Sequence, residues 1–350
     1  MPLVKPSRLR RGDRVAVVSP SWGGPGAHPA RYALGRRTLE ERFGLDVVEM
    51  PHALADPEWL ARNPQARAAD LETAFADPSV RAVIASIGGE DSVRVLPHLD
   101  LGTIARHPKI FLGYSDATSI HFACFKAGVT SFYGPTVMAG FAENGGMFDY
   151  CADSVRRTLF SAEPVGTIEP NRSGWTAEFL DWNDPSLNDR KRALRPSRGP
   201  RTLQGRGVAR GPLLGGCADV LEMLKGTPWW PPLDAWRGAI LFYETSEEAP
   251  PPALVSRWLR NFASQGILQV LSGIVFGRPG GDVDPEHHAD YDAAVVHALD
   301  EAGLVDLPLL AGLDFGHTDP IFTLPYGIEA EVDCAAASLT LTESAVALRQ

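Results

Sequence analysis

A serine directly after a buried strand is the first residue of this sequence that could do chemistry. Ser115 in GYSDAT follows the apolar run KIFLG and precedes a helix expected over about 116–126. This geometry exposes a hydroxyl above a sheet and places the backbone N–H of Asp116 near any oxyanion formed by its attack. The alternative is that Ser115 only caps the helix, with Asp116 and Thr118 satisfying the first-turn amides. The segment alone leaves both interpretations open.

A nucleophilic serine needs a base, and the base needs an acceptor that orients it. Of the nine histidines, His317 alone lies in a glycine-flanked polar turn, DFGHTDP, after a strong apolar run. Glu244 ends the strand GAILFYE, where its carboxylate could hold the imidazole of His317 in the required tautomer. A solvated strand-end carboxylate is the alternative. Just beyond it, Glu247 and Glu248 could meet a substrate amino group, although a solvated helix start explains them equally well.

Two adjacent glycines and two tryptophans are further candidates. Gly88 and Gly89 end the buried run VRAVIASIGG and would let backbone amides approach a reacting carbonyl, although an ordinary tight turn explains them too. Trp175 and Trp182 lie near eight Lys and Arg residues between 190 and 210. An indole there can stack on a base, and the cations can meet a phosphate or carboxylate. A solvated basic loop or a subunit contact is the alternative.

The elements that must position these residues form two α/β units. Short apolar runs ending in Gly, Ser or Pro alternate with helical patterns, which is typical of parallel βα units. They predict a doubly wound sheet in a domain over 1–165 that carries the nucleophile. Periodicity then fails, so 166–210 is expected to be an irregular linker and substrate loop. A second α/β domain over 211–350 follows, and its end, IEAEVDCAAASLTLTE, alternates like antiparallel strands.

Composition excludes several classes of protein. The 350 residues are 44% hydrophobic and 22% charged, as in a folded globular protein. The formal net charge of -10 argues against nucleic acid as a partner, because binding to its phosphates needs clustered cations. The four cysteines are widely separated, so we expect buried thiols in a reducing compartment. Without a signal peptide or a run of about 18 apolar residues, the sequence predicts a cytoplasmic protein with no membrane contact.

One acidic segment could suggest a metal. GDVDPEHHADYD contains two histidines among carboxylates, but HExxH or a comparable ligand spacing is missing. A solvated acidic loop is the favoured interpretation. We therefore expect no metal and no cofactor.

Five motifs, in order along the chain, carry a resemblance to a known family. GYSDAT, GGCADVLEMLKGTPWWP, ILFYETSEE, GIVFGRPGG and DFGHTDP resemble the LD-carboxypeptidase family of serine peptidases. One branch of that family removes the terminal D-alanine from murein tetrapeptides in cell-wall recycling. The other, the microcin C self-immunity carboxypeptidases, hydrolyses the bond joining a peptidyl or aspartyl group to a modified nucleotide. GWTAEFLDW, GGCADVL and ETSEE look more like the second branch.

The resemblance implies catalytic roles for three residues. Ser115 matches the nucleophile, Glu244 the acidic member and His317 the base of a Ser-Glu-His triad. It also implies a flavodoxin-like N-terminal domain joined to a swivelling C-terminal one, a homodimer, and a role in antibiotic resistance or detoxification. A protein of another class, which only binds a nucleotide or sugar on the doubly wound sheet, is the alternative.

The resemblance also implies where the substrate is held. The amides of Asp116 and of the Gly88 and Gly89 turn match the oxyanion hole of the family. Trp182, with Trp175 as a second candidate, is similar to the indole that stacks against the nucleotide base. The expected partner is thus a small peptidyl-nucleotide, or alternatively a murein peptide.

Overall fold

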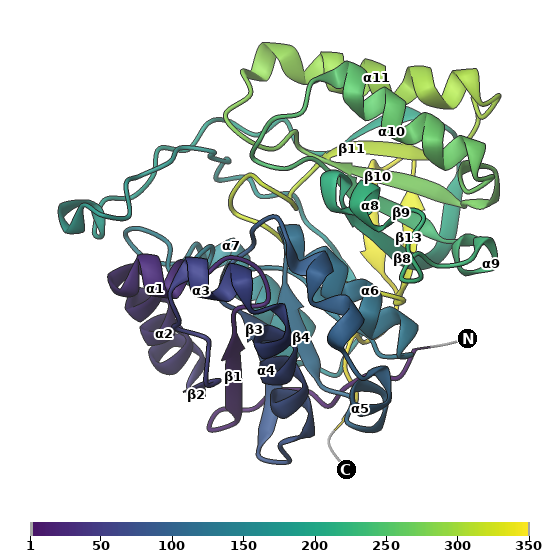
Figure 1. The fold of residues 1–350 in the computed structure, drawn as a ribbon. Coiled ribbons are helices and arrows are strands. Elements are labelled where there is room, and N and C mark those ends of the chain that lie inside the picture. Colours follow the sequence, from purple (N-terminus) through teal and green to yellow (C-terminus); the bar gives the residue numbers. More distant parts are fainter. Residues whose placement is uncertain (1–2, 349–350) are drawn as a thin grey trace.

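Two β-sheets with covering helices divide the molecule (Figure 1). The computed structural model describes residues 3–348. The N-terminal sheet has the order β12-β5-β4-β3-β1-β2, in which β1 to β5 run parallel. This 2-1-3-4-5 order confirms the predicted flavodoxin-like doubly wound sheet. Its strands are β1 (Arg14–Val18), β2 (Asp46–Glu49), β3 (Val80–Ala85), β4 (Ile110–Gly113), β5 (Phe132–Tyr133) and β12 (Leu324–Pro325).

Helices on both faces explain why the central strands of this sheet read as continuous apolar runs. All four residues of β4 and five of the six in β3 are buried. Among the helices, α2 is followed by Gly44, whose φ of 67° is a left-handed backbone conformation that ends the helix. The helices of this unit are α1 (Gly24–Ala27), α2 (Pro29–Phe43), α3 (Pro57–Arg62), α4 (Pro64–Ala76), α5 (Leu101–Arg106), α6 (Thr118–Lys126) and α7 (Asp149–Val155).

The C-terminal sheet is mixed, in the order β6-β14-β13-β8-β9-β10-β11-β7. β8 to β11 run parallel, and the predicted antiparallel end of the chain forms β13 and β14. The strands are β6 (Gly166–Thr167), β7 (Arg201–Gln204), β8 (Val208–Cys217), β9 (Ile240–Glu244), β10 (Gly273–Gly277), β11 (Leu309–Leu313), β13 (Glu329–Asp333) and β14 (Ser338–Leu341).

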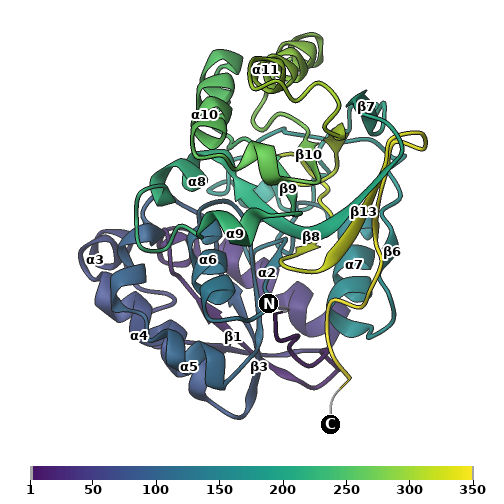
Figure 2. The same cartoon turned by 90° about the vertical axis from the view of Figure 1, so that its right-hand side faces the viewer.

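Helices of this second unit pack over its parallel strands. Figure 2 shows α10 and α11 side by side above β9 and β10, and the two helices contact each other along their length. The buried residues Val255, Leu259 and Phe262 recur at helical spacing on one face of α10. The helices are α8 (Ala218–Leu224), α9 (Leu233–Trp236), α10 (Pro252–Ser264) and α11 (His288–Glu301).

The chain crosses between the two units more than once. β12 comes from the C-terminal part but pairs antiparallel with β5, which completes the N-terminal sheet. Ala347 also forms a bridge to Ser7. Residues near both ends of the chain therefore hold the N-terminal unit together.

The segment 166–210 contains little regular secondary structure. It runs outward in teal in Figure 1 and returns, and its tip is tied to the N-terminal unit. There the Asn144 side chain donates to the carbonyl of Leu187, and the Gly145 amide donates to that of Asn188. Three short strand segments nevertheless fall in this span: β6, β7 and the start of β8. β6 and β7 lie at the two edges of the C-terminal sheet, and the first residues of β8 are largely exposed, so the apolar pattern of all three is weak.

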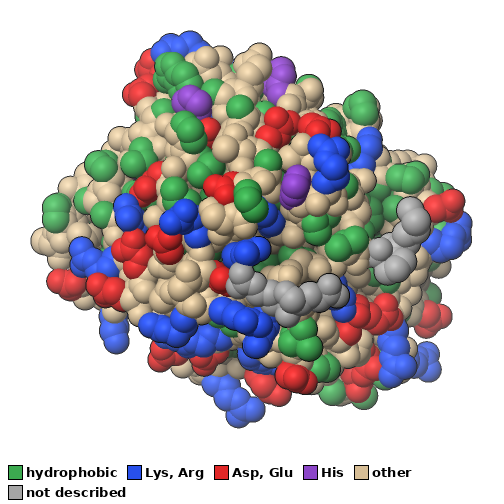
Figure 3. All heavy atoms as spheres, turned by 90° about the horizontal axis from the view of Figure 1, so that it is seen from below, with side chains coloured by type: hydrophobic (Ala, Val, Ile, Leu, Met, Phe, Trp, Pro, Cys, Tyr) green, Lys and Arg blue, Asp and Glu red, His purple; other side chains and the backbone are tan. Residues whose placement is uncertain are grey.

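Basic and acidic side chains are interspersed over the surface seen in Figure 3. Many of them are paired, as Arg36 is with Glu40 and with Glu49. In the described part of the chain, every helix falls short of the length and apolarity needed to cross a bilayer.

Candidate active site

Ser115 stands on a turn between β4 and α6, as the sequence predicts. Its φ of 62° is left-handed, a strained conformation for a residue with a side chain, and it persists only where the surroundings enforce it. The N-cap residue of α6 is Ala117. Neither Ser115 nor Tyr114 caps the helix start with a side-chain hydrogen bond to a backbone amide. Ser115 is therefore not the N-cap of α6 in this structure.

His317 and Glu244 form a hydrogen-bonded pair next to this turn. His317 Nδ1 is 2.8 Å from Glu244 Oε2, and both side chains are buried. Tyr133 donates its hydroxyl hydrogen to the other carboxylate oxygen of Glu244, and the Ser115 amide donates to the Tyr133 hydroxyl at 3.1 Å. A continuous chain of hydrogen bonds thus joins the serine backbone to the imidazole.

Tyr133 was not among the residues that the sequence singled out. It ends β5, the strand next to β4 in the sheet, so only the strand order places it beside Ser115. Burial raises the pKa of its phenol well above the ordinary value, and the Glu244 carboxylate adds to this. The phenol therefore stays protonated and acts as a donor.

The other ring nitrogen of His317 faces the cavity wall. Nε2 lies 2.9 Å from Glu247 Oε2, and among the described residues it has no partner in hydrogen-bonding geometry. Burial lowers the pKa of the imidazole, but the Glu244 and Glu247 carboxylates outweigh burial and raise it well above its usual value. The same contact lowers the pKa of Glu247 to about 2. Since Nδ1 is held by Glu244, Nε2 is the atom that can exchange a proton.

The Gly88 and Gly89 turn lies against the serine. A Cβ on Gly88 would sit 2.9 Å from the Ser115 Cβ and 3.7 Å from the Asp116 amide nitrogen. One on Gly89, whose φ is 154°, would sit 2.8 Å from the Trp22 amide nitrogen. Only a residue without a side chain allows Gly88 to approach Ser115 this closely, and Gly89 fits against the backbone of Trp22 for the same reason.

Asp116 offers its amide, while its side chain is committed elsewhere. The carboxylate is fully buried and accepts from the Ser92 amide at 2.8 Å. Burial raises its pKa. The side chain therefore supports the turn, and the backbone of Asp116 is the part that lies next to Ser115.

A cavity of about 1140 Å³ opens over these residues, between the two units. Ser115, His317, Gly88 and Gly89 are in its lining, and so is Trp182. Its size suits a ligand as large as a nucleotide conjugate.

The two tryptophans of the 166–210 segment are placed differently. Trp182 lines the cavity, with the Arg31 guanidinium 4.9 Å from its ring centre and the His28 ring edge-on at 5.6 Å. Trp175 is 3% exposed, outside the cavity lining, and packs against Arg195 and Arg278. Of the two, only Trp182 is in a position to touch a ligand in this cavity.

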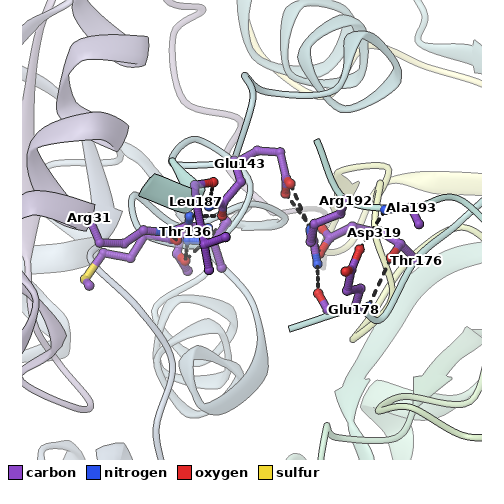
Figure 4. Close-up of polar contacts among 12 residues, drawn as sticks. Arg31, Thr136, Glu143, Thr176, Glu178, Leu187, Arg192, Ala193 and Asp319 are labelled. Atoms are coloured by element: carbon purple, nitrogen blue, oxygen red, sulfur yellow. Dashed lines mark hydrogen bonds and ion pairs between the residues drawn. The ribbon is translucent and has the colours of Figure 1, made fainter. Parts of the chain in front are cut away.

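A buried ion-pair network forms one wall of the cavity (Figure 4). Arg192 donates to both carboxylate oxygens of Glu143 and, at 2.6 Å, to Asp319. It also donates to the carbonyl of Glu178 at 3.1 Å. The network ties the irregular segment to the N-terminal unit and to the turn that carries His317.

Most of the eight cations between 190 and 210 are likewise used inside the chain. Five of them form ion pairs with carboxylates of the protein itself. These five are Arg190, Arg192, Arg195, Arg201 and Arg210. Their main role in this structure is to fasten the segment down.

Replacing Arg192 by methionine should destabilise the protein. The change leaves Glu143, 1% exposed, and Asp319 without their shared cation, and an uncompensated buried charge costs about 3–5 kcal/mol. Urea unfolding measures the difference. Arg190→Met is the matched control, because its pair with Glu178 is more exposed and should contribute less than about 1 kcal/mol. Equal midpoints for the two variants would contradict the proposed role of the network.

One set of side chains among the described residues has the spacing of metal ligands: Cys217, Glu244 and His317, with ligand atoms within 4.8 Å of one another. The Glu244 carboxylate already accepts hydrogen bonds at both oxygens. Burial raises the pKa of the Cys217 thiol well above its ordinary value, so it is held protonated. This chemistry favours an acid–base pair over a metal site.

The fold and this site together define a class of protein. A serine on a strand-to-helix turn, a buried imidazole–carboxylate pair and a cavity between α/β units are what a serine hydrolase uses. Residues 15–134 match the LD-carboxypeptidase N-terminal domain, and residues 210–332 match the LD-carboxypeptidase C-terminal domain. The chain belongs to the LD-carboxypeptidase family, which confirms the resemblance seen in the motifs.

Individual relatives come from both branches. A carboxypeptidase-family protein of Streptomyces coelicolor is 31% identical, with 98% of each chain covered. The microcin C7 self-immunity protein MccF of Escherichia coli is 27% identical over 79% of this chain and 78% of its own. A "probable murein peptide carboxypeptidase" of Bacillus subtilis is 29% identical over 95% and 92%.

Solved structures of the family share the fold. An MccF-like protein from Streptococcus pneumoniae, in complex with AMP, has a TM-score of 0.86 at 29% identity, covering 95% of this chain and 99% of its own. The microcin C7 self-immunity protein in complex with aspartyl sulfamoyl adenosine has a TM-score of 0.84 at 25% identity, covering 98% and 100%. Both confirm the two-domain α/β architecture.

Proposed function

We propose that this protein is a serine carboxypeptidase that hydrolyses the amide bond between an aminoacyl or peptidyl group and a modified nucleotide. The observation that carries the proposal is the buried Glu244–His317 pair behind Ser115, whose strained turn lines the same cavity as Trp182. Membership of a carboxypeptidase family supports the reaction class. A detoxifying or self-immunity role, with a homodimer as the working form, is the corresponding biological proposal.

The reaction proceeds by acyl transfer to water. Ser115 Oγ bonds to the acyl carbon as its proton passes to His317 Nε2, and Glu244 stabilises the imidazolium. The amides of Asp116 and of the Gly88–Gly89 turn donate to the oxyanion. The imidazolium then protonates the leaving nitrogen as the C–N bond breaks. Water, deprotonated by the same imidazole, releases the acyl group and frees Ser115.

The nucleotide half of the substrate is assigned to the Trp182 end of the cavity. Trp182 offers an aromatic face, and Arg31 lies beside it as a cation for a phosphate or sulfamoyl group. The complexes of the relatives with AMP and with aspartyl sulfamoyl adenosine support a nucleotide here. Trp175 is not part of this proposal because it lies outside the cavity lining.

The second candidate is removal of D-alanine from a murein tetrapeptide, which the Bacillus subtilis relative favours. The two functions are separated by incubating the purified protein with an aminoacyl sulfamoyl adenosine and, separately, with murein tetrapeptide. We expect release of sulfamoyl adenosine. Selective release of D-alanine would replace the proposed function by the second candidate. Inertness toward both would favour a binding protein instead.

The pH dependence of the reaction should report on Glu247. A general base works when neutral, so kcat/KM is expected to rise with pH through the raised pKa of His317. Glu247→Gln removes one of the two carboxylates that raise this pKa, so the acidic limb of the profile should move to lower pH. Glu163→Gln, an exposed carboxylate outside the cavity lining, is the control. An acidic limb that stays in place in Glu247→Gln would contradict the assignment.

A further inference from the structure

The cavity wall beside the triad has a chemistry that the proposed reaction does not use. It is built from two separate stretches of the C-terminal unit, the start of α8 and the turn after β9. Asp219 comes from the first, and Ser246, Glu247 and Glu248 come from the second. The Ser246 amide donates to Asp219 Oδ2 at 3.2 Å, which joins the two stretches. Three carboxylates therefore share one wall.

Two of the three carboxylates, those of Asp219 and Glu248, have no cationic partner among the described residues. Within residues 3–348, no Lys or Arg forms an ion pair with any of the three carboxylates, and only Glu247 contacts an imidazole, that of His317. The other cations of the cavity lining lie away from this wall: Arg192 pairs with Glu143 and Asp319, as Figure 4 shows, and Arg31 lies over the Trp182 ring, where the nucleotide is placed. The wall carries negative charge that a ligand can neutralise.

Two further observations point to a ligand at this wall. Ser246 is 7% exposed and lines the cavity, yet its hydroxyl has no hydrogen-bond partner among the described residues. Such a buried hydroxyl normally has one. Val220, Met223 and Trp258 lie in the same lining and add apolar and aromatic surface. An aliphatic stem can pack on that surface while its cationic end meets the carboxylates and the Trp258 ring.

We propose that this wall binds a positively charged side chain of the acyl residue, so that the enzyme prefers substrates whose acyl residue is lysine-like or arginine-like. The inference rests on the proposed function, because the nucleotide is placed at the Trp182 end and the acyl group then extends to the opposite side of Ser115. Asp219 and Glu248 are the specificity-determining carboxylates. An acidic acyl residue is disfavoured by the same charge.

Three aminoacyl sulfamoyl adenosines test this: lysyl, norleucyl and glutamyl. All carry an α-ammonium group, so lysyl and norleucyl differ in side-chain charge at nearly equal length. A charge-assisted hydrogen bond predicts a kcat/KM for lysyl about tenfold or more above norleucyl, with glutamyl the slowest. Equal values for the three substrates would overturn the inference while leaving the proposed function intact. If none of the three substrates were hydrolysed, both the inference and the proposed function would be contradicted.

Variants locate the preference on the wall. In Glu248→Gln and Asp219→Asn the ratio of kcat/KM for lysyl over norleucyl should fall, and a ratio cancels general effects on folding or catalysis. Glu248→Lys should reverse the order of lysyl and glutamyl. Glu41→Gln, on the exposed side of α2 and outside the cavity lining, is the matched control and should keep the parent ratio. If the lysyl-over-norleucyl ratio stayed unchanged in both wall variants, the preference would arise from other residues, and the inference would be overturned.

Discussion

Ser115→Ala is expected to lower kcat/KM for the aminoacyl nucleotide amide by about 10⁴-fold or more, because the acyl-enzyme can no longer form. Binding should survive, since the residue contributes a small part of a large cavity wall. Steady-state assays measure the first quantity, and calorimetric titration with AMP measures the second. If the alanine variant hydrolysed the substrate at the parent rate, Ser115 would not be the nucleophile.

A glycine at the same position separates loss of chemistry from loss of folding. Ser115 has a φ of 62°, which costs a residue with a side chain about 1 kcal/mol relative to glycine. Ser115→Gly should therefore be as inactive as Ser115→Ala but unfold at a higher temperature. Ser173→Ala, at an exposed serine outside the cavity lining, should match the parent in both measurements. A glycine variant that is both inactive and destabilised would mean that the turn is not strained.

Glu244→Gln is expected to reduce kcat by about 10⁴-fold. The carboxylate accepts from His317 Nδ1, so it fixes the tautomer in which Nε2 can take a proton. A glutamine amide can present its NH₂ group to Nδ1 instead, which favours the tautomer with the proton already on Nε2. The parent and variant are compared by single-turnover kinetics, with circular dichroism as the check on folding. A rate within tenfold of the parent would contradict the orienting role of Glu244.

The position of the serine could be predicted from sequence because its signal is local. The run KIFLG followed by a helical pattern determines a strand, a turn and a helix within a few residues. Glu244 and the turn of His317 were also predictable as polar residues after apolar strands. Their pairing was a hypothesis that the family resemblance implied, but local patterns alone could not determine it, because it depends on β10 lying between β9 and β11 in the sheet.

The contacts of side chains on irregular loops could not be predicted from local sequence patterns. The ion pairs of Arg192 join a loop, the N-terminal unit and a C-terminal turn, and no periodicity predicts such a meeting. The same limit applies to Trp175 and Trp182, which lie seven residues apart in one loop (182 − 175 = 7) but face a buried pocket of arginines and the cavity, respectively. Tyr133 was missed because its role comes from a neighbouring strand.

The central claim, that Ser115 forms the acyl-enzyme, is tested most directly by locating the acyl group. The protein is mixed with an excess of aminoacyl sulfamoyl adenosine, quenched in acid within one turnover, digested and mapped by mass spectrometry. The account predicts the acyl mass on the peptide that contains Ser115. Cys217 is the competing nucleophile, because its sulfur lies close to the ligand atoms of Glu244 and His317. An acyl group found on the Cys217 peptide, with none on Ser115, would contradict the account.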